Sequence, residues 1–526
     1  MAAGAAVVGG VAAEPQITTR RLIAFLALIF GMFMAILDIQ IVSSSLSEIQ
    51  AGLSASSDEI SWVQTAYLIA EVVMIPLSGF LARAMSTRYL FAMSAAGFTV
   101  ASLLCATATS INEMIFYRAV QGFIGGGMIP TAFAAAYTIF PKRYQPPVMA
   151  LVGLVVTLAP TIGPTVGGYL TDALSWHWLF LINVPPGIAA TLLCWFLVDF
   201  DKPEFSLLKQ FDAFGLLGMA VFLGSLEYVL EEGERDDWFQ SQTIVVFSML
   251  VVLGALLFFY RAFTAAQPVV DLKAYRDRNF AVGSVLTFML GTVLYGLTYL
   301  YPLFLAQVRG FNALQIGETV FVTGGAMFVF APIVGILGRK LDPRLVIGTG
   351  FVCLIISSLE LLPITKDWGF DQLLWPQLLR GAALMMCMVP INIVALGTLP
   401  PSQLKNASGL FNLMRNLGGA VGLAVINTVL NSRWDMHMAR LRDSVTWSRP
   451  GVVDTLAKMT AGFEATLGSN AELAAAKEVA KMVRQQALVM AFSDVFFGVS
   501  IFLCATTLLV FLVRRPKPGA GAAPAH

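Results

Sequence analysis

The residues of this sequence that could do chemistry are charged side chains placed inside long apolar runs. Asp38, Glu71 and Arg118 are three of them. A charged side chain at the centre of a membrane-spanning helix costs at least ~2.5–3.5 kcal/mol, so it is a functional candidate by default. An apolar environment disfavours the charged form of a carboxyl group, so Asp38 and Glu71 could take up and release a proton near neutral pH. An arginine stays protonated, and we therefore expect Arg118 to modulate a nearby acid.

Their positions along the runs separate these three residues by depth. Asp38 and Arg118 each lie about one and a half turns from the same end of their runs, whereas Glu71 lies near the middle of its own. Asp38 and Arg118 are therefore predicted to share one depth, with Glu71 deeper. Arg380, Arg415 and Asp494 are further charged residues within apolar runs.

A second set of residues could form a pocket for a hydrophobic ligand. Methionine side chains adapt their shape, and aromatic rings accept flat or cationic molecules. The candidates, together with one acid, are Phe33, Met34, Tyr67, Phe288, Tyr295 and Glu227. The alternative that they only contact lipid stays open.

The sequence offers little for enzyme chemistry. Its five cysteines are scattered without metal-ligand spacing, and its three histidines are isolated. We therefore expect no metal site, no cofactor and no enzymatic activity. The net charge of +1 also argues against a nucleic-acid partner.

The elements that position these residues must be membrane-spanning helices. Hydrophobic residues make up 57% of the chain and charged residues 12%, whereas soluble domains average about 25% charged residues. A helix needs roughly 20 apolar residues to cross the hydrocarbon core. Fourteen such runs are present, at about 22–44, 60–82, 89–109, 113–138, 147–170, 178–199, 212–231, 242–262, 280–308, 314–338, 344–363, 374–398, 406–430 and 489–513. This number favours a membrane protein over a soluble one with buried helices.

The basic residues of the loops predict the orientation. Cytoplasmic loops carry an excess of Lys and Arg. With the N-terminus inside, the short inner segments hold nineteen basic residues, and the short outer loops hold three. Both termini are therefore expected in the cytoplasm, with residues 1–16 as a tail and not a signal peptide.

One outer connection, about residues 431–488, is much longer than the others. Long loops translocate largely regardless of charge, so its basic residues do not count against the orientation. Residues 470–486 combine strong helix formers with mixed charge, which predicts a soluble amphipathic helix on the outer face. Loops of this length are usually functional or disordered. The segment therefore either docks a partner, covers the outer vestibule or is a spacer.

Three motifs occupy these helices and their loops. The first is GFLARAMSTR at 79–88, with a counterpart GILGRKLDPR at 335–344. The second is RAVQGFIG at 118–125, and the third is APTIGPTVGG at 159–168. In the third motif, glycines allow another helix to approach closely and prolines bend the helix. A bent, closely packed helix suits two halves that rock about a central site, although simple packing remains an alternative.

These motifs resemble motifs A, B and C of the major facilitator superfamily, and the third is the antiporter signature. Further segments closely resemble EmrB-type exporters with fourteen spans: WHWLFLINVP at 176–185, DWF at 237–239 and PVVDL at 268–272. The resemblance covers about residues 23–511. The sequence departs from the family pattern where Arg83 replaces an acid, where Ser86 replaces a glycine, and after Asp38, where serine replaces asparagine.

The resemblance implies residue roles, which we state as expectations. The antiporter motif would comprise Pro160, Gly163, Pro164, Gly167 and Gly168. The gating loop would comprise Gly79, Arg83 and Arg88. Proton coupling would involve Asp38, Glu71 and Arg118.

The expected fold is an all-α integral membrane protein of the major facilitator type, with two six-helix bundles and a two-helix insertion. The predicted units are a cytoplasmic tail 1–21, an N-terminal bundle 22–199, the insertion 212–262, a C-terminal bundle 280–513 with the extracytoplasmic segment 431–488, and a cytoplasmic tail 514–526.

The function implied is a proton-coupled antiporter in the bacterial inner membrane that exports hydrophobic or amphipathic drugs and toxic compounds. The resemblance also implies a periplasmic membrane fusion protein and an outer-membrane channel as partners, with membrane lipids as the surroundings. Two alternatives stay open. One is an exporter or importer of a single metabolite or fatty acid on the same fold. The other is a membrane enzyme or sensor, for which no nucleophile, metal set or cytoplasmic domain is visible in the sequence.

Overall fold

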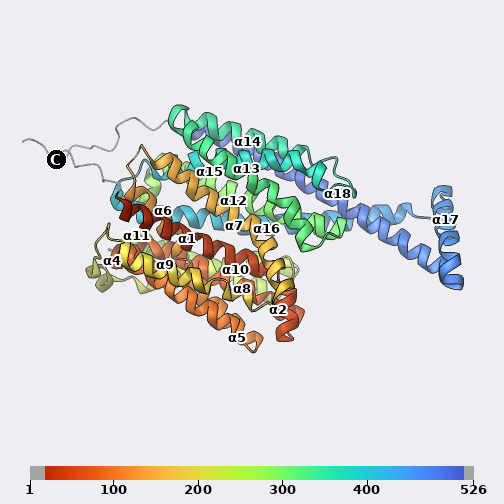
Figure 1. Ribbon diagram of the computed structural model, residues 1–526, viewed down its shortest axis with the longest axis horizontal. Helices are drawn as coiled ribbons and strands as arrows, with labels where there is room; N and C mark the ends of the chain where they lie inside the picture. Colours follow the sequence, from red (N-terminus) through yellow and green to blue (C-terminus); the bar gives the residue numbers. More distant parts are fainter. Residues whose placement is uncertain (1–17, 142, 515–526) are drawn as a thin grey trace, which may run out of the picture.

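The protein is an elongated helical bundle from which one long helical hairpin projects (Figure 1). The computed structural model describes residues 18–141 and 143–514. Within these ranges twelve helices are long and apolar enough to cross a membrane. One of them, α4 (Trp62–Ala106), has the length of two spans, and the shorter apolar helix α14 (Pro343–Leu359) adds another. The chain is thus a multi-pass membrane protein, and its helices accommodate the fourteen predicted spans.

The N-terminal bundle is built from the first long helices. Its principal elements are α1 (Thr19–Ser43), α4, α5 (Ile111–Gly125), α6 (Met128–Ile139), α7 (Gln145–Ala173) and α9 (Val184–Leu197). Short helices connect them: α2 (Leu46–Leu53), α3 (Ser57–Ile60) and α8 (Trp178–Leu181). Helices α5 and α6 together form one span that is interrupted at two successive glycines, 126 and 127.

The two spans predicted at 60–82 and 89–109 are joined without a loop in α4. The turn between them is made by Ser86, whose φ is 75° and ψ is 157°. A side chain is rarely tolerated in this region of positive φ, which favours glycine. This explains in physical terms why glycine is usual at this position of the motif.

The insertion is an antiparallel helix pair, α10 (Ala213–Glu232) and α11 (Gln242–Thr264), preceded by a 3₁₀ turn at Phe205–Gln210. The two helices approach closely at Gly218, where a Cβ would lie only 2.7 Å from the backbone N of Phe258. Helix α10 packs on α4, and α11 leaves eight large apolar residues exposed, as expected of a helix that faces lipid.

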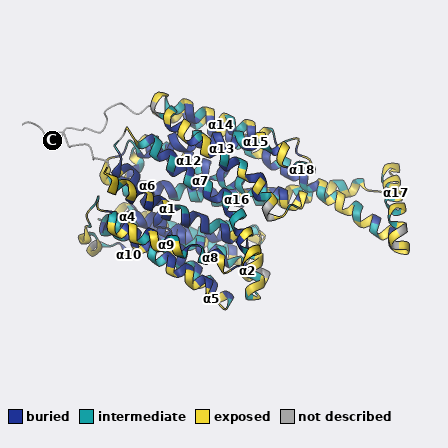
Figure 2. Ribbon diagram, in the orientation of Figure 1, coloured by how far each residue is buried: buried dark blue, intermediate teal, exposed yellow. Residues whose placement is uncertain are grey.

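The C-terminal bundle repeats the architecture of the first. Its elements are α12 (Arg278–Phe304), α13 (Ala313–Lys340), α14, α15 (Phe370–Leu396), α16 (Pro401–Ser444) and α18 (Ala471–Leu509). Further short turns lie at Trp238–Gln240, Leu272–Arg276, Leu305–Arg309, Gly468–Asn470 and Val510–Leu512. Buried residues fill both bundles, whereas the projecting hairpin is largely exposed (Figure 2).

The projecting hairpin consists of the extended ends of α16 and α18, joined by α17 (Pro450–Leu467). Residues 471–486 are helical as expected, and α18 continues without a break from Ala471 into the membrane-spanning run. No proline interrupts residues 471–509, so the helix formers of the outer part propagate directly into the apolar part. Helix α17 was not predicted.

The two bundles are closely packed at the end of the molecule where α1 begins and α18 ends, which we call the terminal end. The opposite end, with the projection, is the hairpin end. Toward the terminal end, the Tyr137 hydroxyl donates to the Asn392 carbonyl at 2.7 Å, and the Ser408 hydroxyl donates to the Pro130 carbonyl at 2.7 Å. These contacts join α6 of one bundle to α15 and α16 of the other.

Candidate functional site

A buried polar network occupies the interior of the N-terminal bundle. Arg118 Nη1 donates to Asp38 Oδ2 at 2.6 Å and to Gln121 Oε1 at 2.7 Å. Asn183 Nδ2 donates to Asp38 Oδ1 at 2.6 Å, and Arg118 Nε donates to the Val63 carbonyl at 3.2 Å. The side chains of Asp38 and Arg118 are both 0% exposed. The network is therefore a desolvated ion pair in which neutral groups bond to both partners, whereas Arg118 Nη2 has no hydrogen-bond partner among the described residues.

Local sequence explains how these groups meet. Arg118 and Gln121 are three residues apart in α5, so they share one helix face. Asn183 stands at the N-cap position of α9 without a side-chain capping bond, and prolines follow in the first turn of the helix. The common depth predicted for Asp38 and Arg118 is thus realised as direct contact. Asn183 was not among the predicted site residues, although the resemblance included its segment.

Tyr67 belongs to this network and not to an open pocket. The Arg118 guanidinium carbon lies 4.2 Å from the centre of the Tyr67 ring, and the ring is fully buried. A stacked guanidinium of this kind gains cation–π attraction in a dry environment. Tyr67 therefore helps to hold Arg118 in position beside Asp38.

Glu71 lies on a different feature, a small cavity of about 70 Å³ between the two bundles and the insertion. Its side chain is 3% exposed, and Oε1 has no hydrogen-bond partner among the described residues. Helix α5–α6 packs directly behind it, since a Cβ on Gly126 would lie 2.9 Å from the Glu71 carbonyl oxygen. Glu71 thus presents a dry acid to the central cavity.

Arg415 of α16 lines the same cavity from the C-terminal bundle. Its Nη2 donates to Asn412 Oδ1 at 2.6 Å, and its guanidinium lies 5.3 Å from the Phe133 ring centre. Its Nε and Nη1 have no hydrogen-bond partner in the part of the chain that the structure describes. The cavity therefore holds an acid and a guanidinium with unused hydrogen-bonding capacity.

The predicted pocket residues divide into two groups. Tyr295 and Glu227 line the central cavity. Phe33, Met34 and Phe288 are not among its lining residues, and Met34 is buried in the apolar core. Two lining residues that the sequence analysis did not select as pocket candidates are Glu231 and Arg415. They come from segments nearly two hundred residues apart, which no local pattern relates.

The antiporter motif packs against α1. A Cβ on Gly163 would lie 2.4 Å from Gln40 Cβ, and one on Gly167 would lie 2.9 Å from the Ile41 carbonyl oxygen. Pro160 and Pro164 lie inside α7, and Gly168 is half-buried. The small residues therefore bring α7 close to the helix that carries Asp38.

The motif 79–88 lies at the terminal end, against α16. A Cβ on Gly79 would lie 2.8 Å from the Asn406 Cα, so the two bundles touch here through backbone. Arg83 lies 5.9 Å from the Phe80 ring centre, and Arg88 lies 5.4 Å from the Trp195 ring centre.

An acid outside the motif joins this contact. Asp201 Oδ2 accepts hydrogen bonds from the backbone N and the hydroxyl of Thr87, both at 2.7 Å. The same oxygen lies 2.6 Å from Lys405 Nζ of α16, which also donates to the Ala82 carbonyl at 2.8 Å. Asp201 thus ties the kink of α4 to the other bundle. Asp201 was not among the predicted site residues. Its one signal in the sequence was that Arg83 stands where the family motif usually has an acid.

These features define a two-bundle transporter with a central cavity. Residues 28–423 match the family model of the Major Facilitator Superfamily. The chain therefore belongs to the Major Facilitator Superfamily.

Its relatives make the placement more specific. The chain is 43% identical over 498 residues to the colistin resistance protein EmrB of Acinetobacter baumannii, covering 94% of this chain and 96% of that protein. It is 30% identical over 513 residues to the multidrug export protein EmrB of Escherichia coli, covering 97% and 98%. The resemblance to EmrB-type transporters predicted from the motifs is confirmed.

The fold itself is similar to a solved structure, that of the human organic anion transporter MFSD10. The TM-score is 0.55 at 14% sequence identity, covering 92% of this chain and 99% of that one. At this identity the likeness concerns the fold alone. The predicted fold class is confirmed.

Proposed function

We propose that this protein is a proton-coupled antiporter that exports hydrophobic or amphipathic drugs and toxic compounds. The single observation that carries the proposal is Glu71, a dry acid without a hydrogen-bond partner at Oε1 on a cavity between two bundles. The relatives named for multidrug export and colistin resistance support the substrate class. Apolar lining residues such as Leu68, Val72 and Ile129 suit a hydrophobic ligand.

Coupling follows from competition at the cavity. Antiport requires that proton and substrate disfavour each other's binding, which is a reciprocal linkage between two ligands. A proton on Glu71 removes one negative charge from the cavity wall, and a substrate that prefers the ionised wall displaces that proton. The Asp38–Arg118 pair lies inside the N-terminal bundle and not on the cavity. Protonation of Asp38 would release Arg118 from it. Rocking of the bundles then exposes the cavity to either side.

The location proposed is the bacterial inner membrane, with both termini in the cytoplasm. The excess of basic residues in the connections at the terminal end supports this orientation. The terminal end then faces the cytoplasm, and the hairpin projects into the periplasm. Asp201 and Lys405 would form part of the cytoplasmic gate.

The hairpin is proposed to dock a periplasmic membrane fusion protein that leads to an outer-membrane channel. An apolar groove between α16, α17 and α18 supports this proposal, lined among others by Met438, Val445, Trp447, Leu456 and Val479. Trp447 is 72% exposed. Exposed aromatic side chains beside an apolar groove are typical of binding surfaces.

The experiment that tests the proposed function is substrate-induced proton release from the purified protein across a panel of amphipathic compounds. Release by several unrelated compounds supports multidrug antiport. Binding of these compounds without proton release contradicts coupling, and neither binding nor proton release with any compound contradicts the function.

A transporter of one anionic metabolite or fatty acid is the second candidate. It is favoured by Arg415, whose guanidinium has unpartnered N–H groups on the cavity. In the panel, it predicts proton movement with a single carboxylate compound and with no other.

A further inference from the structure

The insertion contributes directly to the central cavity. Glu227 and Glu231 of α10 both line it, together with Glu71 of α4 and Arg415 of α16. The two insertion acids are four residues apart, so they share one face of the helix. Glu227 is 6% exposed although its helix lies outside both six-helix bundles. An insertion that served only as a spacer or lipid-facing support would have no reason to turn two acids inward.

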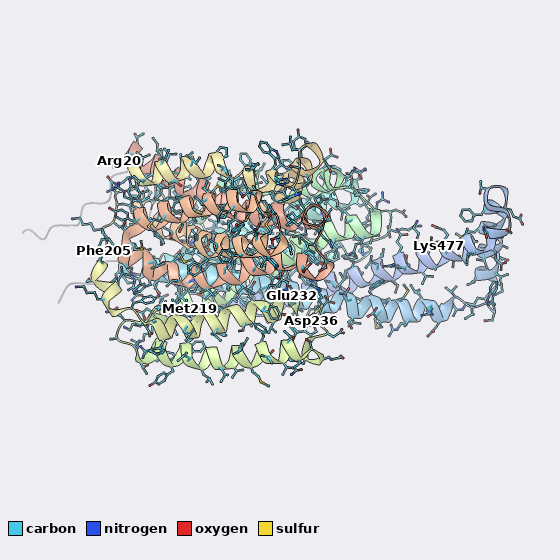
Figure 3. The ribbon with its side chains drawn as sticks, turned by 90° about the horizontal axis from the view of Figure 1, so that it is seen from below. Arg20, Phe205, Met219, Glu232, Asp236 and Lys477 are labelled. Atoms are coloured by element: carbon cyan, nitrogen blue, oxygen red, sulfur yellow. The ribbon has the colours of Figure 1, made fainter. Side chains whose placement is uncertain are left out.

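Contacts to both bundles hold α10 in this position. On the N-terminal side, the Thr65 hydroxyl donates to Glu232 Oε1 at 2.8 Å, and the Trp62 and Tyr228 rings stack with centres 5.4 Å apart. On the C-terminal side, Trp238 of the turn that follows α10 donates through Nε1 to the Thr428 hydroxyl of α16 at 3.2 Å. Figure 3 shows Glu232 and Asp236 at the end of the insertion nearest the projecting hairpin. The acidic face of α10 is thereby fixed against the cavity.

The charges that face the cavity do not balance. The titratable lining groups are Glu71, Glu227, Glu231, Tyr295 and Arg415, that is, three carboxyl groups against one guanidinium. Acids in an apolar environment require a counter-charge or a proton. Glu71 Oε1 is buried and has no hydrogen-bond partner in the described chain, so the cavity holds at least one acceptor that a ligand could satisfy.

We infer that α10 forms an acidic wall of the transport cavity and that Glu227 and Glu231 select lipophilic organic cations. This rests on the proposed function of the cavity in transport. A cation of this class places its charge against the α10 acids and its apolar groups against the aliphatic lining. The Tyr295 ring adds cation–π attraction.

The same chemistry gives the negative linkage that antiport needs. A proton and an organic cation compete for the same carboxylates, so binding of one disfavours the other. An anionic substrate at Arg415 would instead bind better when the neighbouring acids are protonated, which is the linkage of a symporter. The three-to-one ratio of acids to guanidinium therefore favours cationic substrates for this antiporter.

The test is equilibrium binding of tetraphenylphosphonium and of its near-isosteric anion, tetraphenylborate, to the purified full-length protein in nanodiscs. Empty nanodiscs correct for partition into lipid, and pH 8 limits competition by protons. Glu227→Gln and Glu231→Gln are compared with wild type. Glu234→Gln is the matched control, because Glu234 follows the same helix but lines a different cavity and bonds Asn431.

We expect each of Glu227→Gln and Glu231→Gln to weaken tetraphenylphosphonium binding about tenfold, the scale of one charge-assisted contact. The control should keep wild-type affinity, and tetraphenylborate should bind wild type more weakly than the cation. Unchanged cation affinity in both variants, or a wild-type preference for tetraphenylborate, overturns the inference. If an uncharged compound still drives proton release in that case, the proposed function stands. If no compound does so, the proposed function fails as well.

Discussion

Glu71 of α4 and Arg415 of α16 line one cavity from opposite bundles without an ion pair between them. Two opposite charges of this kind attract more strongly as the bundles approach and water leaves. Protonation of Glu71 removes that attraction. In the proposed mechanism, this relationship connects the protonation of one side chain to the relative position of the two halves.

The buried pair Asp38–Arg118 should be needed for folding stability as well as for transport. Asp38→Asn leaves a fully buried guanidinium without its counter-charge, which costs ~3–5 kcal/mol in comparable pairs. We expect a lowered midpoint of thermal unfolding, measured on purified protein by intrinsic fluorescence. The double variant Asp38→Asn with Arg118→Gln should recover most of this loss without recovering transport.

Asp199→Asn is the control for that experiment, because Asp199 forms an exposed ion pair with Arg20 at 3.0 Å. Exposed pairs contribute little to stability, so the unfolding midpoint should stay within error of wild type. Equal effects of Asp38→Asn and Asp199→Asn would contradict a structural role for the buried pair.

The Gly167 contact with α1 should tolerate little added volume. A Cβ there would lie 2.7 Å from the Ser44 hydroxyl oxygen and 2.9 Å from the Ile41 carbonyl. We expect Gly167→Leu to abolish export and Gly167→Ala to reduce it, as measured by drug accumulation in cells. Gly325→Ala is the control, because the space around Gly325 in α13 is open. Full export by Gly167→Leu would show that the contact is not required.

Asp201 should stabilise the closed terminal end. Asp201→Asn removes the ion pair with Lys405 and weakens the bonds to Thr87, so α4 and α16 separate more often. We expect hydrogen exchange of residues 80–90 and 401–410 to rise about tenfold, equivalent to ~1.4 kcal/mol of opening free energy. Asp199→Asn, two residues away, should not change it. Unaltered exchange in Asp201→Asn would exclude this residue from the gate.

The exposed tryptophan of the hairpin should be part of the partner surface. Trp447→Asp is expected to abolish co-purification of a membrane fusion protein and export across the whole envelope, while proton-coupled transport in isolated vesicles persists. Glu464→Gln on α17 changes an exposed charge and should leave both intact. Loss of vesicle transport with partner binding retained would instead identify the hairpin as a lid over the vestibule.

The membrane-spanning helices could be predicted from the sequence, whereas most residues that line the cavity could not. The length of each apolar run predicts a span directly. The positions of Asp38 and Arg118 along their runs also predicted that the two residues lie at the same depth. Packing of segments that are distant in the chain creates the contacts of Asp201, Glu231 and Arg415. Their local sequence therefore does not predict these contacts. The extent of α18 was also missed, because helix propensity and hydropathy were assessed separately along residues 471–509.

The most direct test is proton movement in proteoliposomes that contain wild-type protein or Glu71→Gln. Addition of a transported amphipathic compound should release protons with wild type. Glu71→Gln should reduce this release at least about tenfold, while the variant remains folded and inserted. Wild-type proton release by Glu71→Gln would contradict the assignment of the coupling acid to the central cavity.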